Sequence, residues 1–147
     1  MHKRMRTGPR VTEGVVVVVR RGERLLVIRR APGLLAEGAW CFVGGGIEPG
    51  ESQEQAVVRE FREEVGAAVR PVEKIWEYWR PDRRLRLHWW MGEMDADAEL
   101  SPNPLEVAEL RWCTTAEIQA LDYVLESNRY FLQTIGRRLF GPQSAAG

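Results

Sequence analysis

The fold is decided by Gly45-Gly46-Ile47-Glu48-Pro49-Gly50-Glu51 and, seven residues later, by Arg59-Glu60-Phe61-Arg62-Glu63-Glu64-Val65-Gly66. Pro49-Gly50 predicts a turn between these two segments. Ser52 follows that turn and is a favourable N-cap, while Gly66 is a favourable C-terminal stop. The sequence therefore predicts a helix that begins after Ser52, runs to about Val65 and carries most of the acidic residues of the stretch.

Three of those acids share one face of the predicted helix. At about 100° per residue, Glu60, Glu63 and Glu64 lie within an arc of roughly 100°. Apolar side chains occupy the neighbouring arc and are expected to face the core: Val58, Phe61 and Val65. Ala56 lies one turn before the acids and leaves space above them.

Carboxylates this close repel one another, and a hard divalent cation removes that penalty. Oxygen ligands of this kind suit Mg²⁺ or Mn²⁺, with water and substrate phosphates completing the coordination. The alternative is a solvated helix face on which Arg59 and Arg62 neutralise the acids. The preceding glycines favour the metal site, because they let backbone groups approach a metal or a phosphate closely.

The full pattern is G-x₅-E-x₇-R-E-Φ-x-E-E-x-G, from Gly45 to Gly66. A chance match of its seven specified residues in a chain of this size is rarer than about one in a million. Glu51, just before the helix, can pair with Arg59 or reach the metal. The pattern is therefore a strong signal for a metal-binding helix after a glycine-rich loop.

The rest of the chain predicts strands on both sides of this helix. Strands are expected over 14–20, 24–30, a short 40–43 that Gly44-Gly45-Gly46 breaks, 69–79, 85–94 and 109–113. Thr114 or Thr115 is expected to cap a short helix through 121, and 125–139 to form a terminal helix. These elements predict a mixed α/β sandwich in one domain over 13–140, with a flexible basic tail over 1–12 and a disordered tail over 141–147.

Composition limits the classes of partner. The 147 residues carry 21 basic and 21 acidic side chains, so no global field predicts binding to duplex nucleic acid or to a membrane. No stretch approaches the roughly 20 apolar residues of a membrane span. Cys41 and Cys113 lack a second cysteine or histidine at metal-ligand spacing, which predicts reduced structural thiols in a cytoplasmic protein.

The segment Gly45–Gly66 resembles the Nudix box, with Ala67 at its final hydrophobic slot and Val43 where a proline often precedes the glycines. The resemblance implies an α/β/α sandwich, a divalent metal, and hydrolysis of a nucleoside diphosphate linked to another moiety. Looser matches over roughly 14–112 are closest to MutT-type nucleoside triphosphate pyrophosphohydrolases.

The resemblance also implies residue roles. Metal ligands would be the carbonyl of Gly44, Glu60, Glu63, Glu64 and a later loop glutamate, Glu106, which competes for that role with Glu99 and Glu109. Arg59 and Glu51 would support the catalytic site. Arg30 and Arg83 would hold substrate phosphates or ribose, for which a forked guanidinium is suited.

The base is harder to place. Asn128 lies near the position where MutT-type enzymes read a purine edge, with spacing that differs by about one residue. Several aromatic residues could stack a base or simply pack the sheet: Trp76, Tyr78, Trp79, Trp89 and Trp90.

The expected activity is Mg²⁺-dependent hydrolysis of a (d)NTP, oxidised nucleotides included, to a nucleoside monophosphate and pyrophosphate. In that mechanism the metals would neutralise the polyphosphate and activate water, and one glutamate would accept the proton. The alternatives are ADP-ribose or another nucleotide sugar, the 5′ end of RNA, and a non-catalytic nucleotide sensor. The protein is expected to bind a nucleotide as a monomer or homodimer.

Overall fold

The computed structural model describes residues 10–140, so residues 1–9 of the tail predicted over 1–12 and the whole tail predicted over 141–147 lie outside the described residues. The elements run β1 (Thr12–Arg21), β2 (Arg24–Arg30), β3 (Trp40–Cys41), β4 (Val43–Gly46), α1 (Gln53–Val65), β5 (Arg70–Trp79), β6 (Leu85–Glu93), β7 (Val107–Cys113), α2 (Thr115–Gln119), α3 (Glu126–Gln133) and α4 (Ile135–Phe140). β1 begins at Thr12, one residue before the predicted start of the domain.

The strands form a mixed sheet in the order β3-β2-β1-β6-β5, with β4 also paired to β1 and β7 to β2. β1 and β6 are parallel, and the other pairs are antiparallel. β1 and β2 are paired only near their shared turn, at Arg20↔Leu25 and Arg21↔Arg24. Beyond that turn they separate, and β4 takes the place beside β1. This separation opens a cleft between the two parts of the sheet.

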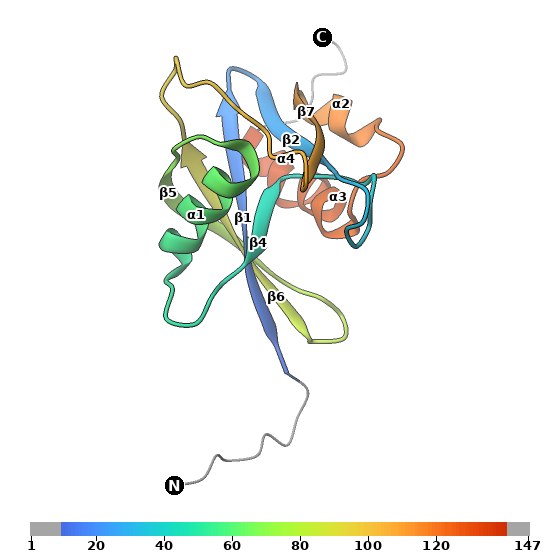
Figure 1. Cartoon of the computed structure of the whole chain (residues 1–147). Helices are drawn as coiled ribbons and strands as arrows, with labels where there is room; N and C mark the ends of the chain where they lie inside the picture. The colour runs from blue at the N-terminus through green and yellow to red at the C-terminus, as the bar shows by residue number, and fades with distance from the viewer. Residues whose placement is uncertain (1–9, 141–147) are drawn as a thin grey trace, which may run out of the picture.

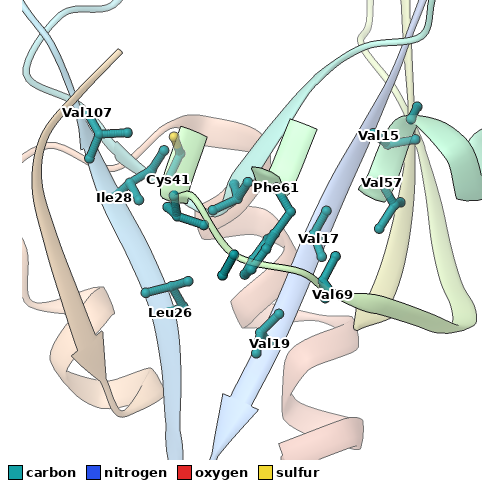
Figure 2. Close-up of a cluster of buried hydrophobic side chains, with 14 residues drawn as sticks. Val15, Val17, Val19, Leu26, Ile28, Cys41, Val57, Phe61, Val69 and Val107 are labelled. Atoms are coloured by element: carbon teal, nitrogen blue, oxygen red, sulfur yellow. The ribbon is translucent and has the colours of Figure 1, made fainter. Parts of the chain in front are cut away.

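Helices cover both faces of the sheet, which confirms the predicted α/β/α sandwich; α1 lies on one side of β1 and α3 on the other (Figure 1). The side chains of β1 contribute alternately to the two hydrophobic layers, because successive side chains of a strand point to opposite faces. Val15, Val17 and Val19 pack with α1, whereas Val16 and Val18 pack with α3. Figure 2 shows Phe61 of α1 among the buried side chains of β1 and β2.

The ends of α1 are those that the sequence predicts. The Ser52 side chain accepts a hydrogen bond from the Gln55 amide, and the Gln55 side chain accepts one from the Ser52 amide, so the two residues form a capping box. Gly66 ends the helix in the left-handed region at φ 70°. These caps fix which residues of α1 face the sheet.

Three local predictions were wrong. Gly44-Gly45-Gly46 does not break the strand but forms most of β4; a Cβ on Gly44 would lie 2.4 Å from the Val15 carbonyl oxygen, so the close pairing with β1 needs glycine. Val57, rather than Val58, faces the core, and Val58 is 37% exposed. The terminal helix is divided at Thr134, whose backbone leaves the helical region at φ −116° and ψ −84°.

A partly buried ionic cluster joins the start of β1 to β6. Glu13 accepts two hydrogen bonds from Arg86, at 3.1 and 2.7 Å, and lies 2.6 Å from Nε2 of the buried His88. Arg86, followed by His88, lowers the pKa of Glu13 from 4.5 to about 2 against the opposing effect of desolvation. The folded state therefore prefers the charged carboxylate at this position.

No helix within residues 10–140 is long and apolar enough to cross a membrane.

We expect Glu13→Gln to lower the melting temperature at pH 7 and to lose that effect in acid. A carboxylate whose folded pKa is lowered stabilises the protein above its unfolded pKa near 4.5, and this contribution disappears as the pH falls toward 2. Thermal unfolding of the two proteins between pH 7 and pH 2 measures the difference. Glu23→Gln, at an exposed turn position, is the control. A constant difference across this pH range would contradict the assignment.

Candidate functional site

Arg59 is the centre of the acidic side of α1. Its Nε and Nη2 donate to both oxygens of Glu51, at 2.6 and 2.9 Å, and its Nη1 donates to Glu60 at 2.9 Å and Glu63 at 3.1 Å. A fifth hydrogen bond, from Nη2 to the Gly46 carbonyl at 2.8 Å, ties the helix to β4. Arg59 lowers the pKa of Glu51 to about 2, so Glu51 stays ionised and fixes the guanidinium.

The acids on this face differ in burial. Glu60 and Glu64 are 8% and 6% exposed, whereas the side chain of Glu63 is 50% exposed. Burial, then Glu60 and then the charge of Glu106, raise the pKa of Glu64 well above its usual range. Glu64 therefore lies where negative charge is in excess.

Gly45 makes room for the acids. A Cβ on Gly45 would lie 2.2 to 2.3 Å from the carboxyl group of Glu60, so the Glu60 carboxylate occupies the space that a side chain would fill. On the loop before β7, Glu106 accepts a hydrogen bond from the side chain of Asn103 at 3.1 Å. The backbone amide of Asn103 donates to the Glu64 carbonyl. The structure thus brings Glu106 to the neighbourhood of Glu64, as the sequence predicts.

The donor set fits a hard divalent cation. Buried carboxylates with excess negative charge, next to a glycine backbone, are the groups that such a cation stabilises. Within residues 10–140, however, no three His, Cys, Asp or Glu side chains are already arranged as metal ligands. Arg59 donates to Glu60 and Glu63 through the same Nη1 atom, so these two carboxylates are held by the guanidinium. The predicted ligands Gly44, Glu60, Glu63, Glu64 and Glu106 remain a prediction.

A cleft of about 450 Å³ opens where β1 and β2 separate. Glu64 and the glycines of β4 lie in its wall at one place, and apolar groups make up much of the rest. The lining residues are Thr12, Gly14, Val15, Val16, Arg30, Leu35, Cys41, Phe42, Gly44, Gly45, Gly46, Glu64, Leu85, Leu87, Leu125, Ser127 and Asn128. An apolar cleft with a few polar groups, next to a cluster of acids, has the composition of a small-molecule site.

Two of the predicted substrate residues line this cleft. The amide oxygen of the buried Asn128 accepts from the Phe42 amide at 2.8 Å, and its Nδ2 donates to Ser127 at 3.1 Å. Arg30 donates through Nε to the Leu35 carbonyl at 2.7 Å. Cys41 also lines the cleft, and burial raises the pKa of its thiol to about 12, which agrees with a structural cysteine.

Other predicted residues lie elsewhere. Arg83 is exposed in the β5–β6 turn, with its guanidinium 4.5 Å from the centre of the Trp79 ring, and is not part of the cleft wall. The five aromatic residues proposed to stack a base do not line the cleft either. Trp89, for example, is fully buried and stacks on Phe131 at 4.3 Å.

The sequence did not single out several residues of the cleft wall. Phe42, Leu85, Leu87 and Ser127 come from three separate segments and carry no motif. The only available signal was the position of Leu85 and Leu87 on alternate positions of one strand, which places both on the same face. Their convergence on the cleft depends on tertiary structure.

Comparison with known proteins agrees with this geometry. The sequence model of the NUDIX domain matches residues 9–135. The chain belongs to the Nudix family. This match confirms the predicted family.

The relatives have different named activities. The chain is 35% identical over 136 residues to the NAD-capped RNA hydrolase NudC of Stutzerimonas stutzeri, covering 92% of this chain and 48% of that protein. It is 35% identical over 118 residues to the CTP pyrophosphohydrolase of Escherichia coli, covering 79% and 84% respectively. The chain thus spans about half the length of the NudC relatives. A MutT protein from Methanosarcina mazei has the same fold, with a TM-score of 0.76 at 22% identity over 91% of this chain and 99% of that one.

We expect Gly45→Ala to lower kcat/KM by about tenfold or more, which corresponds to about 1.4 kcal/mol of transition-state stabilisation. The new methyl group would displace the Glu60 carboxylate, which is the end of a flexible side chain, so the fold should survive. Steady-state kinetics with Mg²⁺ and a nucleotide that the wild type hydrolyses, together with the melting temperature, measure both effects.

Gly46→Ala is the matched control. The nearest atom to its added Cβ is the Glu13 carbonyl oxygen at 4.0 Å, so the methyl group meets no carboxylate. Equal activities of the Gly45→Ala and Gly46→Ala variants would contradict the role of Gly45.

Proposed function

We propose that the protein is a Mg²⁺-dependent nucleoside triphosphate pyrophosphohydrolase. The observation that carries this proposal is the position of the buried Glu64 in the wall of an apolar cleft of about 450 Å³. The cleft offers apolar and aromatic surface to a nucleoside, while the acids of α1 lie beside it for the polyphosphate. The carboxylates cannot bind a polyphosphate directly, since like charges repel, so a cation must lie between them.

The proposed metal ligands are the carboxylates of Glu60, Glu63, Glu64 and Glu106 with the Gly44 carbonyl. Bound there, Mg²⁺ would neutralise the polyphosphate and increase the acidity of a coordinated water molecule. Arg59 holds Glu60 and Glu63 in place through hydrogen bonds at 2.9 and 3.1 Å. Glu51 in turn fixes Arg59, so both residues act on the acids by positioning them.

Different side chains of the protein have different roles in the proposed reaction. One glutamate of the set accepts the proton of the attacking water, whose oxygen bonds to the β-phosphorus in line with the leaving group. The bond from the β-phosphorus to the oxygen that it shares with the α-phosphorus breaks; that oxygen leaves with the nucleoside monophosphate, and the β- and γ-phosphates leave as pyrophosphate. Arg30 lies in the cleft wall and is proposed to donate to a phosphate or to the ribose.

The base is proposed to lie against Phe42 and Leu87, which both line the cleft. Asn128 reads its edge through Nδ2, because its oxygen already accepts from the Phe42 amide. This leaves Asn128 with a donor for the base, which favours a base that offers an acceptor on the edge it presents. The E. coli relative that covers most of this chain is named a CTP pyrophosphohydrolase, which supports a nucleoside triphosphate as substrate.

A second candidate keeps the site and changes the substrate to a diphosphate bridge, such as a nucleotide sugar or a dinucleotide cap. It is favoured by the NudC relatives, which are named NAD-capped RNA hydrolases and share 28–35% identity with this chain. Release of pyrophosphate indicates a triphosphate substrate, whereas two monophosphate products indicate a diphosphate bridge. A non-catalytic sensor would be expected to lack acids of the Nudix box, and this chain keeps them all.

We expect the purified protein with Mg²⁺ to release pyrophosphate from at least one nucleoside triphosphate in a panel that also contains nucleotide sugars and dinucleotides. EDTA should abolish the reaction. Glu64→Gln should lower kcat by about a hundredfold or more, because it removes one proposed metal ligand. Glu54→Gln, at an exposed position on the same helix, should not. Chromatographic identification of the products checks both results; a Glu64→Gln protein as active as the wild type would exclude the proposed metal site.

A further inference from the structure

The turn between β5 and β6 concentrates positive charge. Arg80, Arg83 and Arg84 are exposed there and are accompanied by one acid, Asp82. Arg80 is paired with Asp82 at 2.9 Å. Within residues 10–140, Arg83 and Arg84 form no salt bridge. The turn, which we call the arginine turn and define as residues 80–84, therefore carries a local charge of about +2 in a chain that is neutral overall.

The arginine turn is ordered by its own contacts. Asp82 accepts a hydrogen bond from the Arg84 amide at 2.9 Å, and the Arg83 amide donates to the Arg80 carbonyl at 2.8 Å. The guanidinium groups of Arg83 and Arg86 lie 4.5 and 4.8 Å from the centre of the Trp79 ring. A charged group held in this way loses little conformational entropy when it binds a ligand.

The register of the sheet places this turn at the far end of the cleft. Val16 is paired with Gly44 at the acidic end, Gly14 with Leu87 farther along, and Thr12 with Leu85 at the other end. The Thr12 amide donates to the Arg84 carbonyl at 2.8 Å, and Figure 1 shows the turn beside the start of β1. From Val16 to Thr12 the strand rises about 13 Å, at about 3.3 Å per residue.

A polyphosphate at the acidic end and its base in the cleft would use most of that length. The arginine turn would then face the part of a longer substrate that lies beyond the first nucleoside, rather than the phosphates that are cleaved. Arginine side chains beside a partly exposed tryptophan are the groups that contact the phosphates and bases of a single strand. We propose that the arginine turn binds the nucleotides after the first in a single strand carrying a 5′-triphosphate. This inference rests on the proposed function.

The test compares 5′-triphosphorylated oligoribonucleotides of one, two, four and eight nucleotides. For the wild type, we expect kcat/KM for pyrophosphate release to rise with length and then level off. Arg80→Gln/Arg84→Gln should remove that rise and leave kcat/KM for the mononucleotide unchanged. Arg137→Gln/Arg138→Gln on α4 removes the same charge from an exposed site elsewhere, and it should keep the length dependence.

Salt dependence gives a second readout. The slope of log affinity for the octamer against log salt should fall by about 1.4 in Arg80→Gln/Arg84→Gln, at about 0.7 for each phosphate contact on a single strand. Fluorescence anisotropy measures this slope without catalysis. A 5′-triphosphorylated DNA octamer separates two kinds of contact. If the arginine turn contacts the phosphates alone, Arg80→Gln/Arg84→Gln lowers the affinity for the DNA and RNA octamers equally. If it also contacts the ribose, the affinity for the RNA octamer falls more.

Two results would overturn the proposal: a kcat/KM that is independent of length in the wild type, or an equal loss of octamer binding in the Arg137→Gln/Arg138→Gln control. Competition by a polyglutamate peptide as strong as that by the RNA octamer would show a general anion site and would also overturn it. If no triphosphate of any length is hydrolysed, the proposed function fails instead, and the anisotropy experiment still tests the arginine turn.

Discussion

Arg59 makes the acidic face of α1 possible. Three carboxylates on one helix face, two of them buried, repel one another, and burial strengthens that repulsion. The guanidinium of Arg59 donates to Glu60 and Glu63 and is itself held by both oxygens of Glu51. Arg59 thus keeps the acids in an ordered arrangement, and in the proposed complex a cation would take over part of the neutralisation.

The same guanidinium connects the chemistry to the fold. Its bond to the Gly46 carbonyl fixes the end of β4 against α1, and β4 is the strand that replaces β2 beside β1. Because β1 and β2 separate there, the cleft opens directly beside Glu64. Gly44 and Gly45 are required at this junction for different reasons. Gly44 permits close pairing with β1, and Gly45 leaves space for the Glu60 carboxylate.

Local signals in the sequence were enough to predict the helix, its caps and its acidic face. Ser52 and Gly66 carry the information for the ends of α1, and the spacing of Glu60, Glu63 and Glu64 carries the information for the face. The family resemblance added the fold and the neighbourhood of Glu106, which a helix pattern cannot supply.

The remaining features depend on tertiary contacts. A run of three glycines reads as a break, and only its pairing with β1 makes it a strand. The division of the last helix depends on the backbone angles of Thr134, which no sequence motif marks. The family resemblance implied that Arg83 holds substrate phosphates or ribose, yet Arg83 lies in the β5–β6 turn and does not line the cleft. The type of a residue indicates which ligand its side chain could bind, but the strand register decides whether that side chain reaches the cleft.

Direct Mn²⁺ binding tests whether the acids gathered around Arg59 form a divalent cation site. A Mn²⁺ titration followed by electron paramagnetic resonance counts the bound ions without catalysis. We expect the wild type and Glu54→Gln to bind Mn²⁺ equally, and Glu60→Gln and Glu63→Gln to bind it about tenfold or more weakly. A wild type that binds no Mn²⁺, or variants of Glu60 and Glu63 that bind it as well as Glu54→Gln does, would contradict the proposed site.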